Sequence, residues 1–361
     1  MALQQNKSLQ EPKGWRAAYT KQLIASGLSE GEASAYAAKV VYNPNLLNPP
    51  APAQSQELPL FELTSSTPAI SRKSERIIKA SAEIAMEGAE GDDRMYMHSI
   101  LCQVGLPRSS VAGTSFERRS GGAALLVEAG KLWNGKDFIQ QPIPYGGMPR
   151  LMLAWMNTYA VKSGSPEIPV GDSASEFLRM LGQEPSGGKR GSYTTFKKQI
   201  MALSACRMTL GFNYNGQAHT YEGKPIKHFA AWIAETDEQK PLWPGAVTFS
   251  QEYFETLINH AVPIDFRALS AIKGSALAMD VYMWLAQRLY RIEGRPVILH
   301  WKSLREQFGQ EYQGKNADKD FKKVFLTALK AALAVYPQAK VKTVTGGIMM
   351  MASPPPISFK G

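Results

Sequence analysis

Two segments of this chain, "SYTTFKKQIMALSA" at 192–205 and "ADKDFKKVFLTALKA" at 317–331, carry nearly the same basic, amphipathic pattern. Their Phe-Lys-Lys triplets begin at Phe196 and Phe321, 125 residues apart. At 3.6 residues per turn, the large apolar residues of each segment fall on one side and the lysines occupy the remainder. Both segments are therefore predicted to be helices that bury one face and present a basic face to solvent.

The surroundings of the two segments also match. "MPRLMLAWMNTYAVKSG" followed by "SPEIPVG" corresponds to "AMDVYMWLAQRLYRIEG" followed by "RPVILHW", with Gly164 and Gly294 offset by 130 residues. Each is followed by a short helical pattern, the repeated segment and a β-prone stretch with a turn. Offsets that drift only from 130 to 125 are expected of a duplicated unit whose loops changed length. The order helix, strand, helix, turn, helix, hairpin is that of a winged helix, so the sequence predicts an α+β fold with tandem winged-helix (helix-turn-helix) domains.

Four regions follow from this pattern. Residues 1–42 are predicted to be an N-terminal helical segment of two short helices, with Ser29 capping the second. Residues 43–72 are rich in Pro, Ser and Gln and predict a flexible linker. The first winged-helix domain is placed at 73–260, starting with a helix, and the second at 261–361.

The charge of the chain is concentrated near its end. The net charge is +10, and residues 270–361 carry 14 Lys or Arg against six Asp or Glu, whereas residues 1–72 carry six against five. Such a concentration of positive charge favours a polyanionic partner, and nucleic acid is the commonest polyanion in a cell. A basic surface that merely keeps the protein soluble is the alternative.

The candidate DNA-binding residues lie at the starts and exposed faces of the repeated helices, where a recognition helix meets DNA. The core faces are predicted to hold Phe196, Ile200 and Leu203 in the first copy and Phe321, Phe325, Ala328, Leu329 and Ala332 in the second. Two reading units on one face of B-DNA predict a non-palindromic site of about 20 bp. The candidates are Lys189, Arg190, Tyr193, Thr194, Lys197 and Lys198 in the first copy, and Gln313, Lys315, Asn316, Lys319, Lys322, Lys323, Thr327, Lys330, Lys340 and Lys342 in the second.

No pattern of catalytic chemistry is present in the sequence. The histidines form no His-x-His pair, and "SGGKRGS" departs from a phosphate-binding loop at Gln183 and Arg190. We therefore expect a non-enzymatic protein without metal or cofactor. Cys102 and Cys206, 104 residues apart, predict buried reduced thiols instead of a disulfide or zinc site. The absence of a signal sequence and of an apolar run of about 18 residues favours the cytoplasm.

A family resemblance rests on three stretches. The first comprises "IPYGGMPRLMLAWMNTYAVKSGSPEIPVGDSASEFLRMLG" and "GGKRGSYTTFKKQIMAL" within 143–203. The second is "AVPIDFRALSAIKGSALAMDVYMWLAQRLYR" at 261–291, and the third is the ending "ASPPPISF". In these stretches the chain resembles the plasmid-encoded RepA family of replication initiators. The resemblance implies a bacterial protein that binds direct repeats (iterons) at a plasmid origin, promotes local duplex opening and recruits the host replication initiator and replicative helicase. It also implies a homodimer, formed through the first domain, that represses its own gene and controls copy number.

The segment "QELPLF" at 56–61 is apolar within an otherwise polar linker. It is similar to the hexapeptide with which bacterial proteins dock on the replicative sliding clamp, with Gln56, Leu58, Leu60 and Phe61 at the matching positions. Packing of this segment on the first domain is the alternative. For the whole chain, a transcriptional repressor or partition-type DNA-binding protein without origin opening, and an interaction scaffold with an incidental basic surface, stay open.

Overall fold

The computed structural model describes residues 12–25, 29–39, 71–89, 91–189, 191–214, 217–228 and 245–357. The chain divides into two compact units, Met1–Ala69 and Ile70–Gly361. In the first unit, α1 (Trp15–Ala25) and α2 (Glu30–Lys39) are the two predicted short helices. Ser29 caps α2 as predicted, because its hydroxyl donates to Glu32 Oε2 at 2.5 Å and its N–H donates to the same atom at 3.2 Å.

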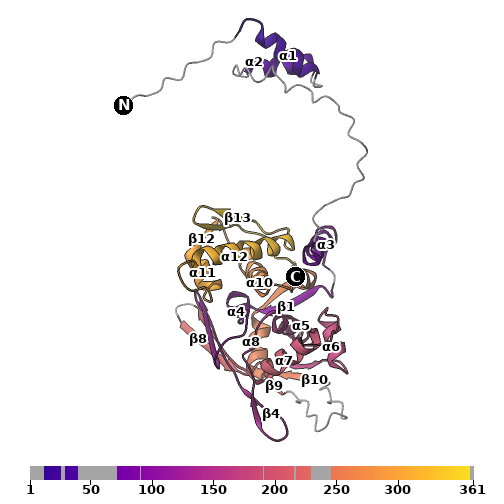
Figure 1. Ribbon diagram of the computed structural model, residues 1–361, viewed down its shortest axis with the longest axis vertical. Coiled ribbons are helices and arrows are strands. Elements are labelled where there is room, and N and C mark those ends of the chain that lie inside the picture. The colour runs from indigo at the N-terminus through magenta and orange to yellow at the C-terminus, as the bar shows by residue number, and fades with distance from the viewer. Residues whose placement is uncertain are drawn as a thin grey trace, which may run out of the picture. The chain divides into compact units, whose positions relative to one another are not determined.

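The second unit is mixed α and β, which confirms the predicted class, and Figure 1 shows its elements. It begins with α3 (Arg72–Met86), β1 (Arg94–His98), α4 (Ser99–Gln103), β2 (Ser115–Ser120), β3 (Ala123–Glu128), β4 (Lys131–Trp133) and β5 (Phe138–Gln140). The first copy of the repeat follows as α5 (Gly147–Ser163), β6 (Glu167–Pro169), α6 (Ala174–Met180), α7 (Ser192–Ala205), β7 (Arg207–Tyr214) and β8 (Gln217–Gly223).

The connection and the second copy complete the chain. The connection consists of β9 (Ile226–His228), β10 (Ala246–Phe249), α8 (Gln251–Asn259), β11 (Ala261–Asp265) and α9 (Phe266–Ala271). The second copy is α10 (Ala276–Arg288), the 3₁₀ turn η2 (Leu289–Arg291), β12 (Val297–His300), α11 (Trp301–Phe308), α12 (Ala317–Ala334), β13 (Val341–Val344) and β14 (Gly347–Met350). The element order predicted from the repeat is therefore confirmed in both copies.

The two copies differ in how their strands pair. In the second copy the strand and the hairpin form one antiparallel sheet in the order β12-β14-β13. In the first copy the strand β6 pairs with β10, in the sheet β6-β10-β9, while the hairpin joins a larger sheet in the order β2-β3-β7-β8. Only the second copy thus keeps its strand and its hairpin in one sheet.

The glycines shared by the repeats serve different purposes. Gly164 and Gly294, with φ of 66° and 68°, both adopt the left-handed conformation that glycine reaches without strain. Gly182 has φ of 64°, whereas its counterpart Gly309 has φ of −128° and needs no left-handed backbone. A Cβ at Gly309 would lie 2.6 Å from Cδ2 of Phe321, so close packing requires that glycine.

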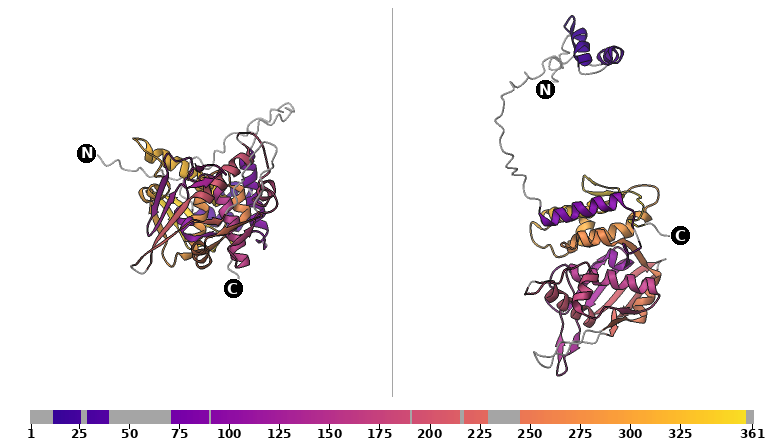
Figure 2. Two further views of the ribbon diagram at one scale, coloured as in Figure 1. Left: turned by 90° about the horizontal axis from the view of Figure 1, so that it is seen from below. Right: turned by 90° about the vertical axis from the view of Figure 1, so that its right-hand side faces the viewer.

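One contiguous core includes the buried residues of both copies. The predicted core faces of α7 and α12 are buried, as are the thiols of Cys102 and Cys206, whose burial was also predicted. Figure 2 shows α3 across the same end of this unit as the orange and yellow helices, and Arg76 Nε on α3 donates to Ala271 O of α9 at 2.9 Å. The division into domains at residues 260 and 261 stays a prediction.

The structure differs from the predicted linker at its end, because α3 begins at Arg72. Ser71 caps this helix by accepting the N–H of Ser74 at 3.2 Å, so the helix includes Arg72, the last residue of the predicted linker. Over the described residues, no helix is long and apolar enough to cross a bilayer. In the same residues, no group of three or more His, Cys, Asp or Glu is placed to hold a metal ion.

Candidate nucleic-acid interface

Helix α12 separates its apolar and charged side chains as the sequence predicts. Phe321 and Phe325 are buried against α10 and α11. The α12 basic face, as we name it, consists of Lys319, Lys322, Lys323, Thr327 and Lys330, all of which are exposed. The Thr327 hydroxyl donates its hydrogen to the Lys323 carbonyl at 3.0 Å, so toward a ligand it can act only as an acceptor. The helix thus presents four ammonium groups along 18 residues.

Two acids, Asp318 and Asp320, lie in the first turn of α12, and Asp318 is directed to α11. Asp318 Oδ1 accepts from Arg305 Nη1 of α11 at 2.7 Å, and Arg305 Nη2 donates to the carbonyl of Tyr312 at 2.9 Å. Asp318 also lies in the first helical turn, where a carboxylate is favoured by the helix dipole. The Asp318 carboxylate therefore joins α12 to α11 and is not paired with the lysines of the α12 basic face.

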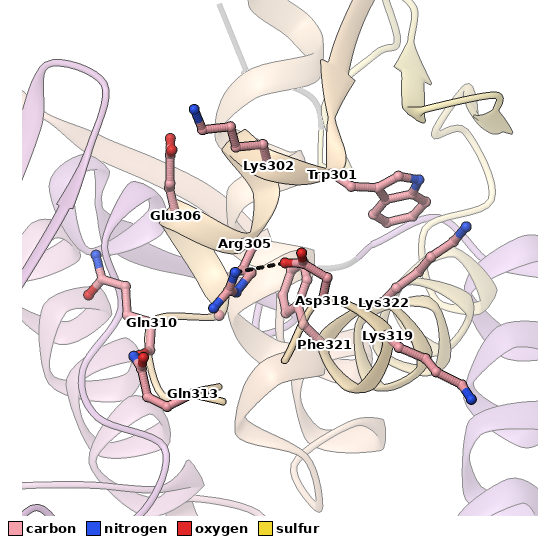
Figure 3. A pocket seen from close by; sticks show the side chains of 11 residues that line it. Trp301, Lys302, Arg305, Glu306, Gln310, Gln313, Asp318, Lys319, Phe321 and Lys322 are labelled. Atoms are coloured by element: carbon pink, nitrogen blue, oxygen red, sulfur yellow. Dashed lines mark hydrogen bonds and ion pairs between the residues drawn. The ribbon is translucent and has the colours of Figure 1, made fainter. Parts of the chain in front are cut away.

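A groove of about 810 Å³ lies between α11 and α12 (Figure 3). Trp301 and Lys322 face each other across one end, with the Lys322 ammonium 5.0 Å from the centre of the indole ring. Lys302 and Arg305 come from α11 and Lys319 from α12, against the carboxylates of Glu306 and Asp318. We call this surface the α11–α12 groove, and it is net positive.

The turn before α12 and the hairpin after it carry the other second-copy candidates. Gln313, Lys315 and Asn316 are exposed in the turn, and Gln313 Nε2 donates to the carbonyl of Gln310 at 2.7 Å. Lys340 and Lys342 are exposed at the start of the hairpin, immediately before and within β13. The structure therefore places the second-copy candidates on one helix, the turn that precedes it and the hairpin that follows it.

The first-copy candidates are fewer on the surface and already have partners. Lys198 Nζ donates to the Tyr145 hydroxyl at 3.1 Å, and the Thr194 hydroxyl donates to the Gly188 carbonyl at 2.8 Å. Tyr193 is half-buried, whereas Lys189 and Lys197 are exposed. Arg190 lies outside the described residues, as do the four residues of the predicted clamp motif, Gln56, Leu58, Leu60 and Phe61.

Helices α7 and α12 lie in different parts of the second unit. In both Figure 1 and Figure 2 the magenta elements around α7 and the yellow elements around α12 occupy different ends. Helix α7 packs against α5, α6 and β9. Consequently seven of its 14 residues are buried, and its exposed basic surface is small beside that of α12.

A buried charge cluster connects the first copy to the turn between α11 and α12. Arg150 of α5 donates from Nε and Nη2 to the two carboxylate oxygens of Asp280 on α10, at 2.6 and 2.9 Å. Arg108 donates to Asp280 at 3.2 Å, to the Phe308 carbonyl at 2.5 Å and to Glu311 at 3.2 Å. Glu311 also accepts a hydrogen bond from Arg118. The cluster thereby holds the end of α11 and the beginning of the turn against the rest of the unit.

Burial and charge act in opposite directions on this cluster. Burial alone raises the pKa of Asp280, but the surrounding guanidinium groups, with Arg150 foremost, bring that pKa below its ordinary value. Burial lowers the pKa of Arg118, whose side chain is only 1% exposed. Among the described residues Arg118 Nε and Arg108 Nη2 find no hydrogen-bond partner, so the cluster has more donors than its two carboxylates accept.

Sequence reasoning missed this cluster and the α11 side of the groove. Asp280 and Arg150 are 130 residues apart, and nothing in a helical pattern pairs them. Trp301, Lys302 and Arg305 were within reach of sequence reasoning, because "WKSLREQF" alternates apolar and basic positions at helical spacing directly before the turn.

Residues 143–302 match the family model described as plasmid encoded RepA protein. The central region of this chain, less than half of its length, is thus similar to the RepA family. This similarity points to a role in plasmid replication. The RepA match spans the first copy, α10 and β12 and ends at Lys302, the second residue of α11, so α12 and its hairpin lie beyond it. No curated protein and no solved structure matches the chain.

Proposed function

We propose that this protein is a plasmid replication initiator that binds double-stranded DNA repeats, or iterons, at the plasmid origin. The observation that carries the proposal is the α12 basic face, flanked by the exposed side chains of the preceding turn and of the β13–β14 hairpin. The similarity of the central region to the RepA family supports the plasmid context. In this proposal the second copy acts as a winged helix and α12 is its recognition helix.

The dimensions of α12 suit a DNA major groove. A helix of 18 residues is about 27 Å long, and the major groove of B-DNA, about 12 Å wide, admits a helix. The N-terminal part of a recognition helix meets base edges, which assigns Gln313, Asn316 and Lys319 to base contacts. Lys322, Lys323 and Lys330 then meet phosphates, and the hairpin lysines contact the adjacent backbone.

Helix α7 is proposed as a second and weaker reader. Its exposed cations Lys189 and Lys197 can contact phosphates, and Lys198 can do so if it leaves Tyr145. Two tethered readers predict a non-palindromic site of about 20 bp. In this arrangement α12 supplies most of the affinity and α7 extends the length of the site.

The remaining steps of initiation are carried over from the family as proposals. We propose that the bound protein promotes opening of the adjacent duplex and recruits the host replication initiator and replicative helicase, without enzymatic activity of its own. A homodimer that represses its own gene and limits copy number is proposed for the protein off the origin. We also propose that residues 56–61 dock on the replicative sliding clamp and that the protein acts in the bacterial cytoplasm.

Footprinting of the purified chain on the region upstream of its own gene tests the proposal. We expect protection of evenly spaced direct repeats of about 20 bp, weakened but not lost when salt rises. With on the order of 6–10 phosphate contacts, affinity should fall about 10³- to 10⁵-fold between 50 and 200 mM salt. Uniform protection that disappears at the higher salt would leave only a non-specific basic surface.

A pair of charge variants separates α12 from the rest of the surface. Lys323→Gln with Lys330→Gln is expected to flatten the slope of log affinity against log salt by roughly 0.9 per lysine. Lys131→Gln removes an equally exposed lysine from β4 and should leave the slope unchanged. Equal effects of the two changes would contradict the assignment of α12 as the main reader.

A repressor or partition-type protein is the second candidate, because a basic recognition helix binds DNA equally well without opening it. Permanganate reactivity of thymines beside the bound repeats distinguishes the two functions. Reactive thymines that depend on the protein support the initiator. Protected repeats without reactive thymines support the repressor.

A further inference from the structure

A second cavity, of about 500 Å³, lies away from α12, between the sheet β2-β3-β7-β8 and the end of α10. Its walls come from α4, from β7 and β8 and from the residues after α8 and α10, so it is formed where the two copies of the repeat meet. Its volume is in the range of about 300–1,000 Å³ that small-molecule pockets occupy. The interface proposed above makes no use of it.

Flat rings make up one wall of this cavity. Phe212 of β7 stacks on His219 of β8, with ring centres 5.0 Å apart and an angle of 14° between the rings. Phe212 also stacks on Tyr221 at 5.6 Å and 12°, and the His260 ring meets its edge at 5.8 Å. Phe212 pairs with His219 and Leu210 with Tyr221 in the β7–β8 register, so the sheet itself fixes the spacing of these rings. Such a fixed aromatic surface suits a planar ring as a ligand.

The charge of the cavity favours an anion. None of the described residues that line it is acidic, whereas His219, His260 and Arg291 are basic. Arg291 is exposed and forms no salt bridge with any described residue. Asn213 and Gln103 add amide groups, which donate and accept hydrogen bonds at the edge of a heterocycle.

A buried polar group lies next to this wall. His98 directly precedes the lining residues Ser99 and Ile100, and its ring centre is 6.3 Å from that of His260. Its Nδ1 accepts the N–H of Ile100 at 3.2 Å, which leaves the proton on Nε2. Nε2 has no hydrogen-bond partner among the described residues. His98 does not itself line the cavity, so its Nε2 is a buried donor behind the His260 side of the wall.

We propose that this cavity binds one nucleotide, with its base against the aromatic wall formed by Phe212, His219 and Tyr221 and its phosphate beside Arg291. The nucleotide has two possible sources, a free mononucleotide or one unpaired nucleotide of an opened DNA strand. Base stacking on aromatic side chains supports both. The cavity alone carries the nucleotide assignment, and only the second source rests on the proposed origin opening.

The test measures binding of AMP and dTMP by equilibrium dialysis, and of a fluorescent single-stranded oligo(dT) by anisotropy, to the full-length chain. Phe212→Leu removes the ring but keeps an apolar side chain, and Arg291→Gln removes the charge. Arg295→Gln is the matched control, since Arg295 is exposed four residues away and does not line the cavity. Thermal melting of each variant verifies that it is folded.

The expected result is a Kd raised about 5- to 150-fold by Phe212→Leu, the range that loss of a stacking ring gives. Arg291→Gln should also weaken binding, whereas Arg295→Gln should not. Binding of the mononucleotides identifies a free nucleotide as the ligand. Binding of oligo(dT) alone, with a photocrosslink from 5-bromodeoxyuridine to the Phe212–Tyr221 peptide, identifies an unpaired strand.

Two outcomes overturn the inference. One is no binding of any of the three probes by a folded chain, and the other is binding that the cavity variants and the control weaken equally. Footprints on duplex repeats should be unchanged in the cavity variants. The failure of this inference is therefore distinguishable from failure of the proposed function, which would remove the footprints of the unaltered chain.

Discussion

Replacing Asp280 by asparagine is expected to destabilise the second unit strongly. The carboxylate is 3% exposed, and it accepts two hydrogen bonds from Arg150 and one from Arg108. Removing its charge leaves the buried guanidinium of Arg150 without a counterion, whereas Arg108 keeps Glu311. Breaking a buried pair in this way costs about 3–5 kcal/mol. An unfolding entropy of about 2.1 cal/mol/K per residue over roughly 290 residues gives about 0.6 kcal/mol/K, so the melting temperature should fall by about 5–8 °C.

Differential scanning calorimetry of the full chain measures this change. Glu222→Gln is the control, because it breaks the ion pair between Glu222 and Arg207, two side chains that are each 56% exposed. Exposed pairs contribute only about 0–1 kcal/mol to stability. The double variant of Asp280→Asn with Arg150→Met should be less destabilised than the sum of the single variants. An Asp280→Asn protein that melts within a degree of the unaltered chain would refute the view that this pair holds the fold.

Two further predictions concern pH and packing. Burial, with a smaller contribution from His260, lowers the pKa of His98 to about 3, so below its ordinary pKa the unfolded chain takes up a proton that the folded chain does not. The contribution of His98 to the free energy of unfolding is therefore present above pH 6.5 and is lost as pH falls, by about 2 kcal/mol between pH 7 and 5. Urea unfolding measures this loss, and the loss should be about 2 kcal/mol smaller in His98→Asn. A Cβ at Gly347 would lie 1.9 Å from the Leu299 carbonyl, so Gly347→Ala should cost at least about 1–3 kcal/mol. Gly88→Ala, where no atom lies within 4 Å, should change the urea midpoint little, and equal midpoints for the two variants would contradict the packing argument.

The sequence was sufficient to predict the elements of the repeat, because their signals are local. Phe196 and Phe321 recur with their helical neighbours, and a period of 3.6 residues specifies both the helix and its buried face. Gly164 likewise marks the end of α5, where the C-cap residue is left-handed.

The pairing of strands and charges was not predictable in the same way. Nothing in "RMTLGFNYNGQAHTYEG" tells whether β7 pairs with the strand of its own copy or with β3, since that choice depends on which edge the folded chain leaves open. Arg118, Arg150 and Asp280 read as surface residues by type, because isolated charged residues are rarely buried. Their burial follows from a mutual arrangement that exists only in three dimensions.

For the candidate interface, the concentration of charge after residue 270 already favours the second helix as the main reader, although the lysine patterns of α7 and α12 are alike. The structure distinguishes them, because Lys198 is bonded to Tyr145 and half of α7 is buried, whereas the α12 basic face is exposed along the helix. The α11–α12 groove was not predictable from the lysine pattern, because it includes an ion pair between Arg305 and Asp318 that joins two helices across a turn.

The unequal pairing of the two hairpins has a consequence for how the repeat can evolve. Strand β7 is bonded on both sides, to β3 and to β8, so a substitution that shifts the first hairpin also disturbs the neighbouring sheet. Among the described strands, the second hairpin pairs only with β12 of its own copy. In the proposed DNA-binding role, target preference should therefore diverge through α12 and β13–β14, while the first hairpin accumulates few changes.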